Sequence, residues 1–259
     1  MKLVAAGCSW TDPNFKSIWN KNHGYTRPWP TTLANSLSME CVNLGLSGNC
    51  IEGVARDVID YVTTYGDEDI GCVSVLLPPW SRFRFGKTNV NPYSVFFNNM
   101  NLEWKTQLKH TADEYLYYHQ TGENTVKYAL TWILMLCEFL EKRNIPYIIS
   151  QGCKAFHEWH VQHVDKKKYP DSISNNRMHS YVDALIGSGL TEELQDKPQL
   201  LGWPFSYAVG GYGMKDALRE KWGNKKYTIS DKDAHPSDEA HDYMAGLMVD
   251  HLKELYVFE

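Results

Sequence analysis

The stretch Ile70–Leu77 reads IGCVSVLL and is apolar at almost every position. A strand with one covered face alternates apolar and polar residues, whereas a strand covered on both faces reads as a continuous apolar run. The stretch therefore predicts an inner strand of a sheet that has helices on both sides.

Short strand-like runs and longer helical patterns alternate on either side of this stretch. Further strands are predicted at 2–6, 40–44 and 145–150, and helices at 31–38, from Asn49 onwards, at 123–143 and after Ser237. In the helix from Asn49, apolar residues recur at the three- and four-residue spacing that forms one buried stripe. Strands separated by helices predict an α/β fold, a flavodoxin-like three-layer α/β/α arrangement with a mainly parallel central sheet.

We expect residues 1–259 to form one domain with long insertions at about 11–29, 81–120 and 154–227. These three segments are rich in aromatic, Asn and Gly residues and show no clean periodicity. Long loops of this kind are commonly binding insertions. Ligands of parallel α/β sheets bind at the carboxyl ends of the strands, so the insertions are expected to surround a site there.

Bulk composition excludes several classes of protein. Hydrophobic residues make up 43% of the chain, enough for a substantial core, and the net charge of -5 gives no sign of nucleic-acid binding. The longest apolar stretch, 129–137, is far shorter than the ~20 residues that span a bilayer. Six cysteines without CxxC spacing, and the lack of a signal-peptide pattern, predict a cytoplasmic protein in a reducing compartment.

Two polar motifs flank the predicted sheet in sequence. Ser9 follows the first strand directly, where its hydroxyl can point into the crevice, but a serine nucleophile needs a base to take its proton. His235 precedes the last helix, and Asp233 stands two residues upstream, as an orienting carboxylate would. Taken alone, each motif also fits an ordinary turn or helix start.

A third motif, Asn43-Leu44-Gly45-Leu46-Ser47-Gly48-Asn49, links the second strand to the strongest helix. Its glycines let the backbone approach a substrate closely, and the helix start supplies N–H groups suited to negative charge. A simple glycine-containing turn explains the same residues.

Together the three motifs resemble the blocks of the SGNH/GDSL hydrolases, and in particular their divergent bacteriophage members. Gly7-Cys8-Ser9-Trp10-Thr11 is similar to the first block, which carries the nucleophile after the first strand. In the second block Gly48 matches the glycine that gives an oxyanion-hole N–H. Asp233-Ala234-His235-Pro236-Ser237 is similar to the last block, with its His-Pro pair before the terminal helix.

Two departures from the family pattern leave alternatives open. The third block usually presents an Asn as second oxyanion donor, but the strand here runs into Trp80-Ser81-Arg82. Ser81, Arg82 or Asn49 are the candidates to replace it, and Trp80 is a candidate for substrate binding. The family's acid stands three residues before the histidine, where this chain has Lys232, so Asp233 is the expected acid and Asp231 the alternative.

The resemblance implies a serine-dependent ester hydrolase that works through an acyl-enzyme and needs no cofactor or metal. Its partner would be a small-molecule or glycan ester. Tryptophans in or beside the insertions favour a carbohydrate-linked ester, such as an O-acetyl group, over a long-chain lipid. The alternative is a non-catalytic binding or structural module that retains the fold.

His157, His160 and His163 lack metalloprotease spacing and are interpreted as a surface helix. The oligomeric state stays open.

Overall fold

The structure is a computed structural model of the 259-residue chain. It describes residues 1–17, 19, 24–85, 88–90, 122–155, 176–223 and 227–258. The segment 156–175, with its three histidines, lies outside the described residues, as does most of the predicted insertion at 81–120.

A five-stranded sheet in the order β2-β1-β3-β6-β7 forms the middle layer, and all its pairings are parallel. Its strands are β1 (Lys2–Gly7), β2 (Glu40–Asn43), β3 (Ile70–Leu77), β6 (Tyr147–Gln151) and β7 (Leu200–Leu201). In β3 all eight residues are buried, as its continuous apolar sequence predicts. Two short antiparallel hairpins lie outside the sheet: β4 (Phe83–Phe85) with β5 (Thr88–Val90), and β8 (Thr228–Ser230) with β9 (Asp233–Pro236).

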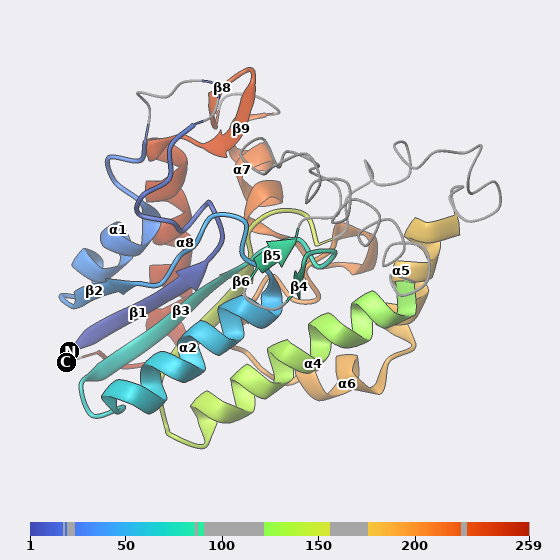
Figure 1. The fold of residues 1–259 in the computed structure, drawn as a ribbon, viewed down its shortest axis with the longest axis horizontal. Helices are drawn as coiled ribbons and strands as arrows, with labels where there is room; N and C mark the ends of the chain where they lie inside the picture. Colours follow the sequence, from blue (N-terminus) through green and yellow to red (C-terminus); the bar gives the residue numbers. More distant parts are fainter. Residues whose placement is uncertain are drawn as a thin grey trace.

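Helices cover both faces of the sheet, which gives the predicted three-layer α/β/α fold (Figure 1). Along β1, Val4 and Ala6 join one core, and Leu3 and Ala5 join the other, because successive side chains of a strand point to opposite faces. The first core takes its helical residues from α2 (Ile51–Tyr65), α4 (Gly122–Glu141), α5 (Asn176–Ile186) and α6 (Gly189–Gln195). The second takes them from α1 (Trp29–Ser36), α7 (Met214–Trp222) and α8 (Asp238–Leu255).

Helices α8 and α2 begin with caps that the sequence supplies. The hydroxyl of Ser237 accepts a hydrogen bond from the Ala240 N–H at the start of α8, as its position before the helix predicts. Helix α2 starts two residues later than expected, because the Cys50 sulfur accepts from the Gly53 N–H and makes Cys50 the cap. None of the helices in the described part of the chain has both the length and the hydropathy needed to cross a bilayer.

The segment 154–227, treated as an insertion in the sequence analysis, contains ordered elements in its described part. Strand β7 lies there and extends the central sheet next to β6. The segment also supplies α5, α6, the 3-10 helix η2 (Tyr207–Val209) and α7. A strand of two residues has no alternation that a sequence pattern could reveal, which explains why its place in the sheet was missed.

The turn after β1 packs closely against the loop after β2. Asn43 bridges the two: its side-chain amide donates to the Thr11 carbonyl at 2.7 Å and its oxygen accepts from the Gly45 N–H at 2.8 Å. A Cβ at Gly45 would stand 2.5 Å from the Thr11 carbonyl carbon and 2.7 Å from the Asp12 nitrogen. Only glycine therefore fits between these two backbones.

We expect Gly45→Ala to lower the free energy of unfolding by about 1–3 kcal/mol, since the added methyl group must push one backbone away. Gly246→Ala is the matched control, because Gly246 is exposed in α8 with no described atom within 4 Å of its added methyl group. The control should raise the stability by about 0.5–1 kcal/mol, since alanine favours a helix interior. Urea unfolding measures both, and a Gly45→Ala protein as stable as wild type would contradict the close packing.

Candidate active site

A tight turn brings Ser9 to the carboxyl end of β1. The N–H groups of Thr11 and Asp12 both donate to the Cys8 carbonyl, at 2.8 and 3.0 Å, so the chain reverses directly after the serine. A Cβ at Gly7 would collide with the Thr11 hydroxyl and with the Leu76 carbonyl on β3, so a larger residue cannot make this turn. Ser9 is 9% exposed, at the edge of the buried sheet.

The β8–β9 hairpin carries Asp233 and His235 on one short strand. In this hairpin Thr228 pairs with Pro236 and Ser230 pairs with Asp233, and the Ser237 N–H donates to the Tyr227 carbonyl at 2.8 Å. The hairpin leads directly into α8, whose start is fixed by the Ser237 cap. This strand was not expected from the sequence, which predicts only a loop before the last helix.

Ser9, His235 and Asp233 form a continuous chain of hydrogen bonds. The His235 Nδ1 lies 2.6 Å from Asp233 Oδ1, and its Nε2 lies 2.9 Å from the Ser9 Oγ. The same carboxylate oxygen also accepts from the His235 backbone N–H at 3.1 Å. Because an ionised carboxylate only accepts hydrogen bonds, Nδ1 carries the proton and Nε2 is left to accept from the serine hydroxyl.

The environment of Asp233 keeps it ionised. The carboxyl is 3% exposed, and burial alone raises its pKa. Hydrogen bonds from Ser17 and His235 outweigh this effect, so that the pKa lies below its usual value. A buried carboxylate beside an imidazole fixes the orientation of the ring and stabilises its cationic form.

The loop from Asn43 to Asn49 is held against the turn of Ser9. The Asp12 carboxylate accepts from both the backbone N–H and the hydroxyl of Ser47, at 3.0 and 2.5 Å. Gly48 has a φ of +82°, a left-handed conformation that favours glycine, and no described atom lies within 4 Å of the place of a Cβ. The Gly48 backbone thus borders open space beside the candidate nucleophile's turn.

Asn49 and Trp80 use their side chains within the protein. The Asn49 amide nitrogen donates to Asp57 at 2.9 Å and its oxygen accepts from the Cys50 N–H at 3.0 Å. The Trp80 indole N–H donates to Gln151 at 2.8 Å, and both Asn49 and Trp80 are 1% exposed. These contacts join the site to α2 and β6.

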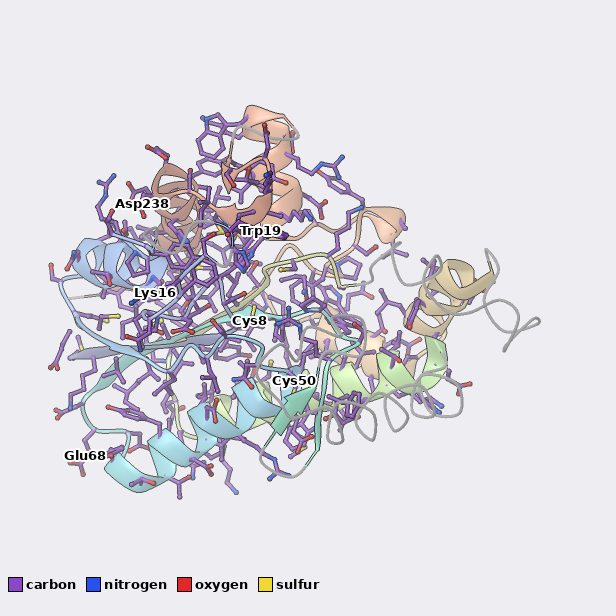
Figure 2. The ribbon with its side chains drawn as sticks, turned by 45° about the horizontal axis from the view of Figure 1, so that its top comes forward. Cys8, Lys16, Trp19, Cys50, Glu68 and Asp238 are labelled. Carbon is purple, nitrogen blue, oxygen red and sulfur yellow. The ribbon has the colours of Figure 1, made fainter. Side chains whose placement is uncertain are left out.

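Cys8 and Arg82 lie together at this end of the sheet. A hydrogen bond from the Cys153 thiol and the positive charge of Arg82 lower the pKa of the Cys8 thiol, against the effect of burial. In Figure 2, Cys8 and Cys50 lie in the middle of the molecule, and Glu68 lies at the opposite end of α2 from Cys50. Ser81 is buried next to Arg82.

Two aromatic residues, Phe15 and Tyr25, contact His235 and Ser9 of this hydrogen-bonded chain and were missed in the sequence. The Phe15 ring packs on His235 with 4.2 Å between ring centroids, and it stacks on Tyr25 at 4.7 Å. The Tyr25 hydroxyl donates to the Ser9 carbonyl at 3.1 Å. Both rings come from the segment 11–29, which has no periodicity to show that they point inwards.

Most of the tryptophans expected near the site are buried where the structure describes them. Trp10, Trp29 and Trp80 are at most 4% exposed and belong to the cores, whereas Trp19 is 60% exposed. Trp104 and Trp159 lie outside the described residues. Within the described ranges, no three His, Cys, Asp or Glu side chains come together as a metal site would require.

Comparison with known proteins gives structural likenesses of low sequence identity. No protein-family model and no curated protein sequence matches this chain. A lipolytic protein of the G-D-S-L family from Desulfitobacterium hafniense is 13% identical, with a TM-score of 0.46, over 96% of this chain and 98% of that chain. An acetyl xylan esterase is 14% identical, with a TM-score of 0.45, over 99% and 100%. An acylhydrolase from Bacteroides fragilis is 13% identical, with a TM-score of 0.44, over 98% and 87%.

A second histidine, His241, lies next to Tyr25, the residue that donates to the Ser9 carbonyl. It is 0% exposed, its Nδ1 accepts from the Trp29 N–H at 3.3 Å, and the Tyr25 ring meets it edge-on at 4.1 Å. Burial lowers the pKa of His241 from 6.5 to about 3. His241 is therefore neutral in the folded protein near pH 7.

This buried histidine predicts a loss of stability in mild acid. Below about pH 6.5 the unfolded chain protonates His241 and the folded protein does not, so stability falls as the pH is lowered towards 3. Between pH 7 and pH 5 this costs about 2 kcal/mol. His241→Asn keeps an acceptor for the Trp29 N–H and should lack this part of the pH dependence. Urea unfolding at both pH values measures it, and an unchanged difference between them in the variant would contradict the assignment.

Proposed function

We propose that this protein is a serine hydrolase that cleaves carboxylic esters through an acyl-enzyme. Ser9 is the nucleophile, His235 the general base and Asp233 the orienting acid. The observation that carries this proposal is the 2.9 Å contact between Ser9 Oγ and His235 Nε2, two atoms whose residues are 226 positions apart. A nucleophile within hydrogen-bond reach of a base that a third group orients is the arrangement that activates a serine.

In the first half of the reaction, Ser9 Oγ attacks the ester carbonyl while His235 Nε2 takes the hydroxyl proton. The carbonyl oxygen becomes negatively charged, and the backbone N–H groups of Ser9 and Gly48 are our candidates to stabilise it. The tetrahedral intermediate then expels the alcohol, which leaves with the proton from His235. Ser9 is now acylated.

In the second half, water takes the place of the alcohol. His235 removes a proton from the water as its oxygen attacks the acyl carbon, and the proton then passes to Ser9 Oγ as the acid leaves. Asp233 holds the ring in the tautomer needed in both halves, because its Oδ1 accepts from Nδ1.

For the substrate we propose a small-molecule or glycan ester, and in particular a carbohydrate O-acetyl group. Support comes from Trp19, which is 60% exposed on the segment that also carries Phe15 and Tyr25. An exposed indole offers a face on which a sugar ring can stack. Membership of the divergent bacteriophage branch stays a prediction from the three sequence blocks.

Hydrolysis of p-nitrophenyl acetate tests the proposal. Ser9→Ala removes the nucleophile and should lower kcat by at least ~10³-fold, to the background rate. Ser36→Ala is the matched control, since the Ser36 hydroxyl is exposed on α1 and donates to the Thr32 carbonyl one turn earlier in the same helix. A fluorophosphonate probe should add one label to the wild type and to the control, and none to Ser9→Ala.

Wild-type activity in Ser9→Ala would overturn the proposed nucleophile. A wild-type protein that neither hydrolyses the ester nor takes up the probe would instead favour the alternative, a binding module with this fold.

The identity of the acid has a test of its own. Asp233→Asn should lower kcat by up to ~10⁴-fold, because an amide at this position selects the wrong tautomer of His235. Asp231→Asn changes the exposed acid two residues away and should keep kcat within about twofold of wild type, since surface substitutions usually have small effects. The kcat for ester hydrolysis is measured for both variants. A larger loss in Asp231→Asn than in Asp233→Asn would assign the role of the acid to Asp231.

A further inference from the structure

Arg82 connects the third strand to the loop of Gly48. It stands five residues after the end of β3, and its Nη1 donates to the Asn49 carbonyl at 3.2 Å. Asn49 follows Gly48 directly in sequence. One nitrogen of the guanidinium is therefore fixed beside the backbone that offers a candidate oxyanion N–H.

A second nitrogen of the same group has no partner. The Arg82 Nε is buried and has no hydrogen-bond acceptor among the residues that the structure describes. A guanidinium stays protonated, so this N–H is a permanent donor. A buried donor without an acceptor costs about 1–3 kcal/mol, so such groups are rare in native proteins, and a catalytic role is one explanation for keeping one.

The open donor lies at the same edge of the sheet as the nucleophile. Strands β1 and β3 are parallel neighbours, with Gly7 opposite Leu76, so the residues that follow both strands meet there. The charge of Arg82 acts on the thiols of both Cys8, which precedes Ser9, and Cys153, which follows β6: it helps to lower the pKa of Cys8, and it opposes the hydrogen bond with Cys8 and the burial that raise the pKa of Cys153. Arg82 is thus close to the turn of Ser9 as well as to the loop of Gly48.

We propose that Arg82 is a further catalytic residue, whose Nε–H donates to the oxyanion of the tetrahedral intermediate together with the N–H groups of Ser9 and Gly48. This inference rests on the proposed ester hydrolysis. As the Ser9 Oγ–carbon bond forms, the electron pair of the carbonyl bond moves to oxygen, and the oxygen accepts from Nε. When the bond to the alcohol breaks, the pair returns to the carbonyl and the hydrogen bond weakens.

A charged donor stabilises the oxyanion more than it stabilises the carbonyl of the bound ester. The neutral carbonyl gains little from a guanidinium, whereas the oxyanion gains a charge-assisted hydrogen bond. The contribution of Arg82 is therefore expected in kcat and hardly in KM.

The test compares Arg82→Gln and Arg82→Lys with wild type in p-nitrophenyl acetate hydrolysis. Both variants should lose about 10²–10³-fold in kcat, the usual effect of removing one oxyanion donor, with KM nearly unchanged. Arg82→Lys keeps the positive charge near Cys8 but lacks the Nε–H, so it separates the donor from the charge. Arg143→Gln, at the opposite edge of the sheet before β6, is the matched control and should keep wild-type kcat.

Chemical rescue adds a measurement that altered folding cannot reproduce. In Arg82→Ala, millimolar guanidinium should occupy the vacated place and restore part of kcat. The same ion should have no such effect on wild type or on Ser9→Ala. Thermal unfolding of each variant shows whether it is folded.

The outcomes separate this inference from the proposed function. If Ser9→Ala is inactive and both Arg82→Gln and Arg82→Lys keep wild-type kcat, the role of Arg82 is overturned and the hydrolase stands. If Ser9→Ala keeps full activity, both fall together. A loss confined to KM, or one that appears only with negatively charged esters, also overturns the oxyanion role, since it shows that Arg82 binds the ground state.

Discussion

The parallel pairing of β1 with β2 on one side and β3 on the other is the constraint on which the site depends. Parallel strands run in one direction, so the segments that leave their carboxyl ends emerge along one edge of the sheet. Ser9, Gly48 and Arg82 each follow one of these three strands. Because β1 is covered by helices on both faces, the turn of Ser9 is built on one of the most deeply buried parts of the chain.

The sequence revealed the elements whose patterns are long or fully apolar. Strand β3 is apolar at almost every position, α2 has a clean stripe, and α8 begins at a serine cap, so the starts of all three were predicted within about two residues. The β8–β9 hairpin and β7 were missed because strands of two to four residues are too short to show alternation. Contacts with other segments, rather than local preference, hold such strands in place.

The residues of the candidate site also differ in how well the sequence reveals them. Ser9, Asp233 and His235 stand in short motifs that sequence alone can single out, and the structure brings these three side chains together. Phe15 and Tyr25 could not be found, because their contacts with His235 and Ser9 join residues from a segment without periodicity. The sequence also could not tell that Gln151 accepts a hydrogen bond from the indole N–H of Trp80, since these two residues are 71 positions apart.

The β8–β9 hairpin lies late in the chain, and this position affects when Ser9 can become reactive. It holds two of the three residues of the proposed triad, Asp233 and His235, which are made after all five strands of the sheet. A nascent chain can thus pair its whole sheet and expose Ser9 while the serine still has no base to activate it. In the proposed mechanism, Ser9 becomes reactive only after residues near 235 have left the ribosome and packed beside it. Catalytic activity therefore requires that folding is complete.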